Sequence, residues 1–213
     1  MSPNKFHTLS GVDLRSLYIK NIQIIDNFIS DDEIGLVNQS IWKTENEDWA
    51  WHSDGGKVQT HRVLQSSFAS GLINHSLTPL ISGLIGRRLE VFVEPYIRIY
   101  SQGSSLEYHI DGEGDDASGP IPLQMYSDDY RRCAAMIEYA ANVYLSSSFE
   151  GGEIYFHHLN HSVKPKSGQL IIFPAGSEYA HSVSKIESGE RRALVVFYTT
   201  DKLRDLHRKI TQH

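Results

Sequence analysis

The spacing of apolar and polar residues at the start of the chain predicts a strand followed by a helix. Residues 18–25 contain four isoleucines and read as a strand. Ser30 and Glu33 then have the spacing of a capping box, so a helix is expected from about residue 31 to residue 42. The apolar positions of this helix keep helical spacing at Ile34, Val37 and Ile41.

The pattern changes from helical to strand-like along the next part of the chain. A second helix is expected to start near Pro79, a favourable first-turn residue, and to end by Gly86. From Leu89 onward, short runs rich in β-branched and aromatic residues predict strands. Pro95 interrupts the first run and indicates an irregular or edge position. The expected strands are residues 89–100, 134–145, 153–156, 162–165, 169–173 and 191–200.

Helices followed by about eight short strands predict a mainly β protein with flanking helices. This order favours a double-stranded β-helix, the jelly-roll core that is also found in cupins. We expect a single domain over residues 1–213. Residues 1–88 would form an N-terminal support of helices and strands, residues 89–200 the jelly-roll core, and residues 201–210 a C-terminal helix.

Composition and charge narrow the class of protein. The 213 residues are 40% hydrophobic and 22% charged, as is ordinary for a soluble protein, and the net charge of −6 argues against a nucleic-acid partner. The single cysteine, Cys133, excludes an internal disulfide framework and a cysteine-cluster zinc site. No apolar run approaches about 20 residues, so no membrane span is expected. The N-terminal residues lack the apolar segment of a signal peptide, and we expect a cytoplasmic protein.

Three residues have the spacing of a catalytic iron centre. His109 and Asp111 lie two apart, and on a strand such residues point to the same side. His181 follows 72 residues later and would have to come from a neighbouring strand. Two imidazoles and one carboxylate bind one face of Fe(II) and leave its other positions open. A second pair, His52 and Asp54, runs directly into a glycine turn and is the weaker candidate.

The chain resembles the Fe(II)/2-oxoglutarate-dependent dioxygenases, most closely their prolyl 4-hydroxylase-like branch, over residues 94–200. The preceding strand and helix at residues 19–43 are also similar to that branch. The resemblance rests on seven elements that occur in order, which makes it far more specific than any one of them. They are Arg98-Ile99-Tyr100, His109-x-Asp111, residues 142–145, residues 149–153, residues 164–174, His181-x-Val183 and Gly189-Glu190-Arg191.

The resemblance implies a role for each site residue. It implies that His109, Asp111 and His181 bind Fe(II), and that Arg191 binds the distal carboxylate of 2-oxoglutarate. A guanidinium suits this task because it can form two parallel, charge-assisted hydrogen bonds to a carboxylate. Prolyl 4-hydroxylases commonly have lysine at this position, so the arginine is a departure. Arg192 is the competing residue and is expected to face solvent, because adjacent strand residues point to opposite sides.

The resemblance gives weaker indications for other residues. Tyr144 would assist Arg191 at the same carboxylate, or would be a core aromatic. Tyr100 would line the pocket, or would only pack. Gly151 and Gly152 are expected to form a hairpin turn with no catalytic part. Residues 45–68 lie outside the strong match, and their candidates for the substrate side are Trp49, Trp51 and Arg62.

The resemblance also implies the reaction. With Fe(II) as the catalytic metal, 2-oxoglutarate and O2 would be consumed in hydroxylating an unactivated C–H bond, with release of succinate and CO2; ascorbate would be an accessory reductant. The expected substrate is a prolyl residue in a peptide or protein, and the alternatives are a free amino acid or a small metabolite. A cupin-like metal protein with other chemistry is the competing class, since fold alone does not fix function. The oligomeric state is not readable from the sequence.

An insert follows the first two expected metal ligands. Residues 112–133 are rich in glycine and proline, which favours a loop. From Asp111 to Asp129 the chain has six acidic residues and no lysine or arginine. We expect a lid over the site that favours a positively charged substrate, or else a solvated surface loop.

Overall fold

The computed structural model describes residues 20–42, 58–65, 67–92, 94–111, 136–146 and 148–200, and of residues 41 and 42 it describes the backbone alone. Several expectations fall outside these residues. They concern Trp49 and Trp51, the pair His52 and Asp54, the insert at residues 112–133 and the closing helix at residues 201–210.

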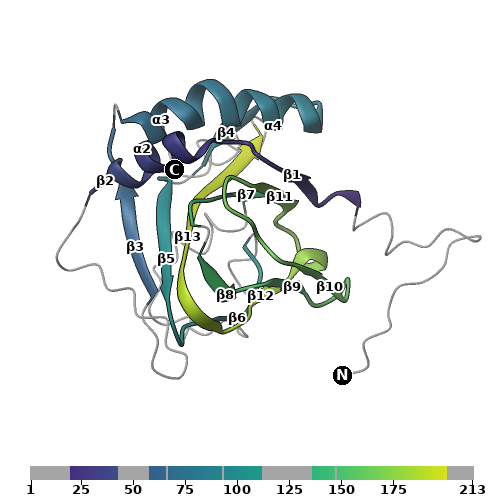
Figure 1. The fold of residues 1–213 in the computed structure, drawn as a ribbon. Helices are drawn as coiled ribbons and strands as arrows, with labels where there is room; N and C mark the ends of the chain where they lie inside the picture. Colours follow the sequence, from purple (N-terminus) through teal and green to yellow (C-terminus); the bar gives the residue numbers. More distant parts are fainter. Residues whose placement is uncertain are drawn as a thin grey trace, which may run out of the picture.

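Two β-sheets face each other and form the jelly-roll core that the strand pattern predicted (Figure 1). The major sheet has the order β1 (Gln23–Ile25), β11 (Leu170–Pro174), β7 (Tyr139–Tyr144), β13 (Ile186–Thr200), β5 (Tyr96–Ser101), β3 (Val58–Val63) and β2 (Ile41–Trp42). In addition, β4 (Leu89–Val91) and β8 (Phe149–Gly151) pair with β13. The minor sheet has the order β10 (His161–Val163), β9 (Ile154–Phe156), β12 (His181–Val183) and β6 (Leu106–His109).

Alternation along the central strand β13 separates a helix-facing side from an inner side. Leu194 and Val196 pack into a core with helical residues, whereas Ala193 and Val195 pack between the two sheets. The neighbouring strands keep this alternation, because Arg191 pairs directly with Tyr100 on β5 and Ala193 with Tyr144 on β7. The inner side of the major sheet is therefore the wall that can carry a site.

The helix α2 (Asp31–Gln39) has the predicted capping box at its start but ends earlier than predicted. The Ser30 side chain accepts from the Glu33 backbone, and the Glu33 carboxylate accepts from the Ser30 N–H at 2.8 Å. At the other end, the Ser40 hydroxyl donates to the Leu36 carbonyl at 2.8 Å and the chain then turns into β2. Residues 41 and 42 are β-branched and aromatic, types that fit a strand beside β3 better than a final helical turn.

The second helical region begins well before Pro79, so the predicted start was wrong. Helix α3 (Phe68–Leu72), the π-helical turn η1 (Ile73–Leu77) and α4 (Thr78–Ile85) follow one another without a break. A wide π turn directly before Pro79 accommodates a ring that would otherwise clash with the carbonyl four residues back. The helix ends at Gly86, as predicted, and Gly86 has the left-handed conformation at φ 71°.

The three helices lie together on the outer side of the major sheet (Figure 1). The apolar side chains between them and the sheet include Val37, Leu77 and Ile81, which are fully buried against Ile97 and Leu194. This layer holds the outer side of β5 and β13 rigid. In the part of the chain that the structure describes, no helix is long and apolar enough to cross a bilayer.

The strand prediction was right in outline; the structure confirms its detail at Pro95 and contradicts its detail at Gly151 and Gly152. Pro95 does interrupt the first run, because β4 ends at Val91 and β5 begins at Tyr96. Gly151 and Gly152 do not form a hairpin. They carry the chain from β8, which pairs with β13 in the major sheet, to β9 in the minor sheet. Both glycines have positive φ, at 76° and 69°, which this sharp passage between sheets requires.

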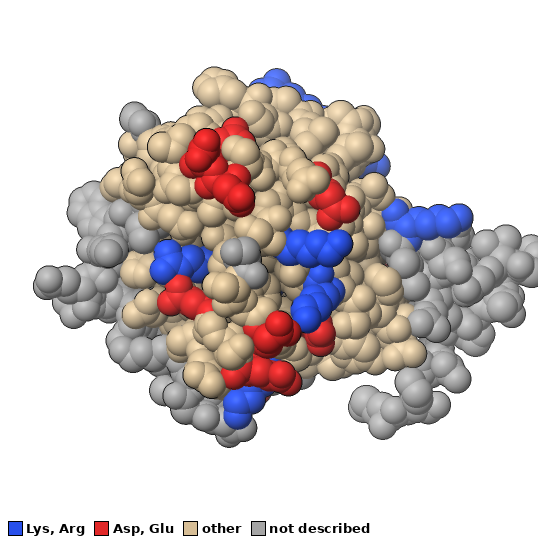
Figure 2. All heavy atoms as spheres, viewed as in Figure 1, with Lys and Arg blue, Asp and Glu red and all other residues tan. Residues whose placement is uncertain are grey.

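One face of the molecule carries acidic and basic groups side by side (Figure 2). On that face, the described residues form no continuous basic surface that could follow a phosphate backbone.

Candidate active site

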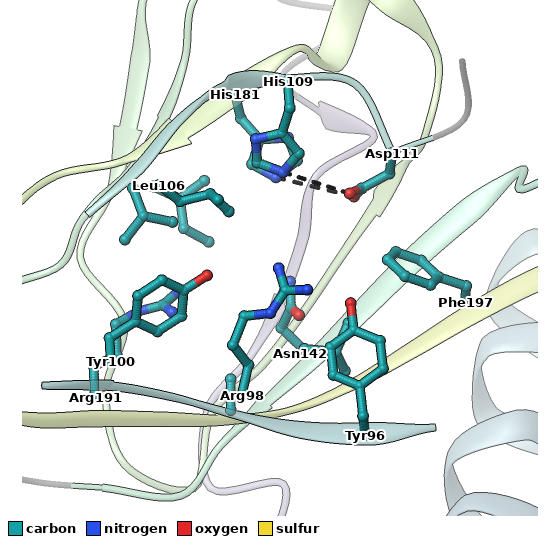
Figure 3. Close-up of a pocket in the computed structure, with 14 residues that line it drawn as sticks. Tyr96, Arg98, Tyr100, Leu106, His109, Asp111, Asn142, His181, Arg191 and Phe197 are labelled. Atoms are coloured by element: carbon teal, nitrogen blue, oxygen red, sulfur yellow. Dashed lines mark ion pairs between the residues drawn. The ribbon is translucent and has the colours of Figure 1, made fainter. Parts of the chain in front are cut away.

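His109, Asp111 and His181 converge at one end of the space between the sheets (Figure 3). His109 is the last residue of β6 and pairs directly with His181, the first residue of β12. Asp111 lies in the turn just beyond β6 rather than on the strand itself. Its carboxylate oxygens are 3.6 Å from His109 Nε2 and 3.9 Å from His181 Nε2. One ligand atom from each residue lies within 4.8 Å of the others, so the group could hold a metal ion.

Backbone carbonyls fix the orientation of both imidazole rings. His109 Nδ1 is 2.8 Å from the Glu107 carbonyl, and His181 Nδ1 is 3.0 Å from the Tyr179 carbonyl. A carbonyl can only accept, so Nδ1 carries the proton and donates in each case. The Nε2 atoms of both rings are left to face Asp111. Metal-binding histidines are typically held in this way by their other ring nitrogen.

The electrostatics keep the two kinds of ligand in the forms that bind a metal. Burial, with the nearby His109 ring as a second cause, lowers the pKa of His181 to about 4, so this imidazole is neutral near pH 7. Burial alone would raise the pKa of Asp111, but His181, His109 and Arg98 outweigh it and hold that pKa below its ordinary value. Two neutral imidazoles and one carboxylate are the donor set that suits Fe(II) with open coordination positions.

Arg191 lies deeper in the same space and is 3% exposed. Its Nη2 donates to the Tyr144 hydroxyl at 3.1 Å, and its guanidinium carbon lies 4.9 Å from the centre of the Tyr100 ring. Gly152 makes room for this side chain, because a Cβ there would lie 2.9 Å from Arg191 Cδ. Burial raises the pKa of Tyr144, which therefore keeps its proton and can donate it.

Within the described residues, Arg191 makes no ion pair with a carboxylate, and its buried Nε has no hydrogen-bond partner. A buried cation without a counter-charge is costly, and an incoming carboxylate would remove that cost. The structure thus brings the predicted pair, Arg191 and Tyr144, together in an arrangement suited to binding a carboxylate.

A narrow cavity connects the two groups. Its lining includes the triad, Arg191 and Tyr100, and also three polar residues for which no role was predicted. These three are Tyr96, Arg98 and Asn142 (Figure 3). Arg98 and Asn142 stand in matched motifs, but only the pairing of β3, β5, β13 and β7 shows that they face inward.

Other predicted residues lie away from the cavity. Arg62 is on β3, but its side chain is 57% exposed, forms an ion pair with Glu94 at 3.6 Å and does not line the cavity. Arg192 points away from the site, as predicted, but it does not simply face solvent. Its Nη1 donates to Asn38 Oδ1 at 3.2 Å, which ties β13 to helix α2.

Comparison with known proteins agrees with this geometry. Residues 96–199, which include the triad, Arg191 and the cavity walls, match the model of the 2OG-Fe(II) oxygenase superfamily. This match assigns residues 96–199 of the chain to the 2OG-Fe(II) oxygenase superfamily. Enzymes of this superfamily use Fe(II), 2-oxoglutarate and O2.

Individual sequence relatives and solved structures are also similar to this chain. Human prolyl 3-hydroxylase 2 is 38% identical over 77 residues, a match that covers 33% of this chain and 11% of the relative. The chain therefore matches only about a tenth of the length of such relatives. Among solved structures, a viral collagen prolyl hydroxylase from Paramecium Bursaria Chlorella virus-1 in complex with 2OG aligns with TM-score 0.61 and 18% identity, covering 84% of this chain and 96% of that one.

A second solved structure with the same fold is a prolyl hydroxylase from Trichoplax adhaerens in complex with a hypoxia inducible factor peptide fragment. It aligns with TM-score 0.61 and 16% identity, and covers 91% of this chain and 92% of that one. At such identities the structures establish the shared fold, and with it the jelly-roll core.

Proposed function

We propose that this protein is an Fe(II)- and 2-oxoglutarate-dependent dioxygenase that hydroxylates a prolyl residue in a peptide or protein. One observation carries the proposal. A buried arginine that has no carboxylate partner among the described residues opens onto the same cavity as a complete set of two histidines and one carboxylate. A cupin with other chemistry has no need of a carboxylate-binding group at that depth, so this pairing favours the dioxygenase.

In this proposal all three residues of the triad bind the metal. His109 and His181 bind Fe(II) through Nε2, and Asp111 binds it through its carboxylate. The bound iron, with 2-oxoglutarate and O2, supplies the oxidising power that hydroxylates the C–H bond and yields succinate and CO2. The carbonyls of Glu107 and Tyr179 hold the two rings in position throughout.

Arg191 and Tyr144 bind the distal carboxylate of 2-oxoglutarate. The guanidinium offers parallel N–H donors, and the neutral Tyr144 hydroxyl adds one more. The apolar side chains of Leu106, Ile154 and Val183 line the cavity between this group and the triad and exclude water from it. Binding at the arginine thus sets the position of the cosubstrate relative to the metal ligands.

The choice of a prolyl substrate is supported by the named relatives. The sequence relatives of this chain include prolyl 3-hydroxylases, and several proteins that share the fold are prolyl hydroxylases, one of them in complex with a peptide. The relatives by sequence act at C3, whereas the resemblance noted in the sequence points to C4. We keep the prolyl residue as the target and leave the carbon atom to be identified from the product.

The test has two readouts. The purified protein is supplied with Fe(II), 2-oxoglutarate and a library of proline-containing peptides, and both succinate formation and peptide mass are followed. We expect succinate formation that depends on iron, together with a mass gain of one oxygen on a proline. Absence of iron-dependent succinate would overturn the dioxygenase proposal, and succinate formation stimulated only by compounds without a prolyl residue would overturn the substrate.

A further inference from the structure

The two strands that carry the histidine ligands pair irregularly beside the triad. β12 and β6 pair directly at His181 and His109, but the register shifts between His181 and Val183. Two residues of β6, Glu107 and Tyr108, lie there opposite a single residue of β12. Such a β-bulge is common next to active sites, because it changes the direction in which a side chain points.

The bulge makes the position of His109 depend on more than the strand ladder. The Glu107 carbonyl, which lies in the bulge, is the group that accepts from His109 Nδ1 at 2.8 Å. A bulge also disrupts the ladder locally, so the pairing of β6 with β12 is weakened at this point. The ring centres of His109 and His181 are only 4.2 Å apart, so a small shift between the strands would separate two ligands of one ion.

The imidazole of His157, which follows β9, contacts all three neighbouring strands of the minor sheet (Figure 1). Its Nε2 is 2.8 Å from the hydroxyl of Ser182, the β12 residue opposite the bulge. Its ring packs edge to face against Tyr155 of β9 and Tyr108 of β6, with ring centres 4.7 and 5.1 Å apart. Ser182 and Tyr155 alternate with inward-facing neighbours, so this imidazole lies on the outer side of the sheet, behind the ligands.

His157 is also held by the main chain and by its own turn. Its N–H donates to the Ala180 carbonyl at 2.9 Å, so its backbone and side chain bond the residues on both sides of His181. Within the turn, Asn160 has φ 46°, a left-handed conformation that asparagine adopts more readily than most residues. The Asn160 side chain accepts from the Tyr155 hydroxyl at 2.6 Å. The turn therefore presents His157 at a fixed place over β12.

A second metal site does not explain this arrangement. His157, His158 and His161 are close in the sequence, but among the described residues only the triad gathers three potential ligands that could hold one ion. His158 Nε2 instead lies 3.0 Å from the Tyr108 hydroxyl, which adds a hydrogen bond between the turn and the bulge. The contacts of the turn are thus directed at the strands that carry the ligands.

We propose that His157 is a positioning residue for the metal centre. From the outer side of the minor sheet it fixes β12 and the bulge of β6 relative to each other, so that His181 and His109 point at one ion. It acts through Ser182 and Tyr108 and does not bind the metal itself. This inference rests on the proposed function, because it concerns the metal that this function requires.

Metal binding tests this role without turnover. Mn(II) is titrated into the metal-free protein, and the visible spectrum of bound Co(II) reports the coordination geometry. We expect about tenfold weaker Mn(II) binding and an altered Co(II) spectrum in His157→Ala, as for the loss of an outer-shell partner. His157→Gln should keep Mn(II) binding within about threefold of the wild type, because the glutamine amide can replace the imidazole Nε2 at Ser182.

Two control variants separate positioning from a general loss of stability. His161→Ala is the matched histidine control, because His161 lies on β10, at the opposite edge of the minor sheet from β6. It should leave Mn(II) affinity unchanged. Val163→Ala removes buried apolar atoms from the same strand, and it should lower the free energy of unfolding without weakening Mn(II) binding.

Ser182→Ala and Tyr108→Phe each remove a single hydroxyl and should each weaken Mn(II) binding about threefold. They decide the matter if His157→Ala does not fold. Wild-type affinity in both, or a loss in Val163→Ala as large as in His157→Ala, would reject the positioning role and leave the proposed function intact. A wild-type protein that binds no Mn(II), or a His109→Ala protein that binds it equally well, would reject the metal centre and the positioning role together.

Discussion

Arg191 and Arg192 are consecutive residues of β13 whose guanidinium groups lie on opposite sides of the major sheet. Arg191 donates to the Tyr144 hydroxyl inside the cavity, whereas Arg192 donates to Asn38 on helix α2. The two residues have the same charge and almost the same place in the sequence. They therefore form a natural pair for testing what the inner position does.

Replacing Arg191 by methionine should raise the 2-oxoglutarate concentration for half-maximal turnover by on the order of 100-fold, because the distal carboxylate loses its charged partner in a buried place. Arg192→Met should leave this concentration within about threefold and should cost stability only through its contacts with Asn38 and Glu190, which are outside the cavity. Steady-state kinetics with varied 2-oxoglutarate measures both. Similar increases in the two variants would refute the assignment of inner and outer sides.

Removal of any one of His109, Asp111 and His181 should abolish metal binding and leave a folded protein. Titration with Mn(II), a redox-inert probe, should show affinity at least about 100-fold lower in each alanine variant, more than the loss of an outer-shell partner typically causes. The double variant of His52 and Asp54 to alanine should bind as the wild type does. The assignment is wrong if this double variant loses the metal and His109→Ala keeps it.

The triad was predictable from the sequence because the spacing of His109 and Asp111 and the order of the shared motifs indicated all three residues. Residues two apart near a strand end share a side, and the shared motifs supplied the third ligand. The capping box of α2 and the end of α4 at Gly86 follow from local signals, and both were predicted correctly. These features depend on a few neighbouring residues and hardly on the rest of the fold.

Arg98 and the strand β3 show what the sequence alone did not give. The β3 segment has apolar residues only at its ends, Val58 and Val63, so it lacks the alternation that marks a strand. It is a strand because it pairs with β5 along its length, a contact between segments far apart in the sequence. As long as β3 is not recognised as a strand, Arg98 on β5 cannot be distinguished from an ordinary polar residue. The inward position of Arg98 becomes visible only after the sheet is assembled.

The start of the second helix was missed for a different reason. Its first turn follows a polar region, and Pro79 reads as a helix start although the helix runs through it. Ser67 gave a local signal that could have been used, because its side chain accepts from the Ser70 N–H and caps α3.

Gly152→Ala should disturb the Arg191 site, although Gly152 itself is not part of that site. Gly152 has φ 69°, and an added Cβ would lie 2.7 Å from Ile186 Cδ1 and 2.9 Å from Arg191 Cδ. We expect a loss of about 1–3 kcal/mol in the free energy of unfolding, together with weaker 2-oxoglutarate binding. Gly35→Ala is the matched control, because it lies within α2 with nothing within 4 Å of the new Cβ.

That control should stabilise the protein by about 0.5–1 kcal/mol without changing 2-oxoglutarate affinity, since alanine favours a helix over glycine. Chemical unfolding and calorimetric titration give the two quantities. A Gly152→Ala protein that binds 2-oxoglutarate as tightly as the wild type would show that close packing at Gly152 does not position Arg191.

Tyr198 should make the fold sensitive to alkaline pH. Its side chain is fully buried in the core under the helices, where its hydroxyl is 3.2 Å from the Thr78 hydroxyl. Burial raises the pKa of Tyr198, and the hydrogen bond with Thr78 opposes this only in part. In the unfolded chain, the pKa of tyrosine is about 10. Below that pH both states keep the proton, and the contribution of Tyr198 to stability is complete.

Above about pH 10 the unfolded chain loses the Tyr198 proton while the folded protein keeps it, so the free energy of unfolding should fall by up to about 1.4 kcal/mol per pH unit. Tyr198→Phe should cost about 0.5–1.5 kcal/mol at pH 7, through the lost hydrogen bond, and should have a shallower decline above pH 10. Urea unfolding of both proteins from pH 7 to pH 11 measures the difference. Parallel curves over that range would show that Tyr198 ionises as readily in the folded protein as in the unfolded chain.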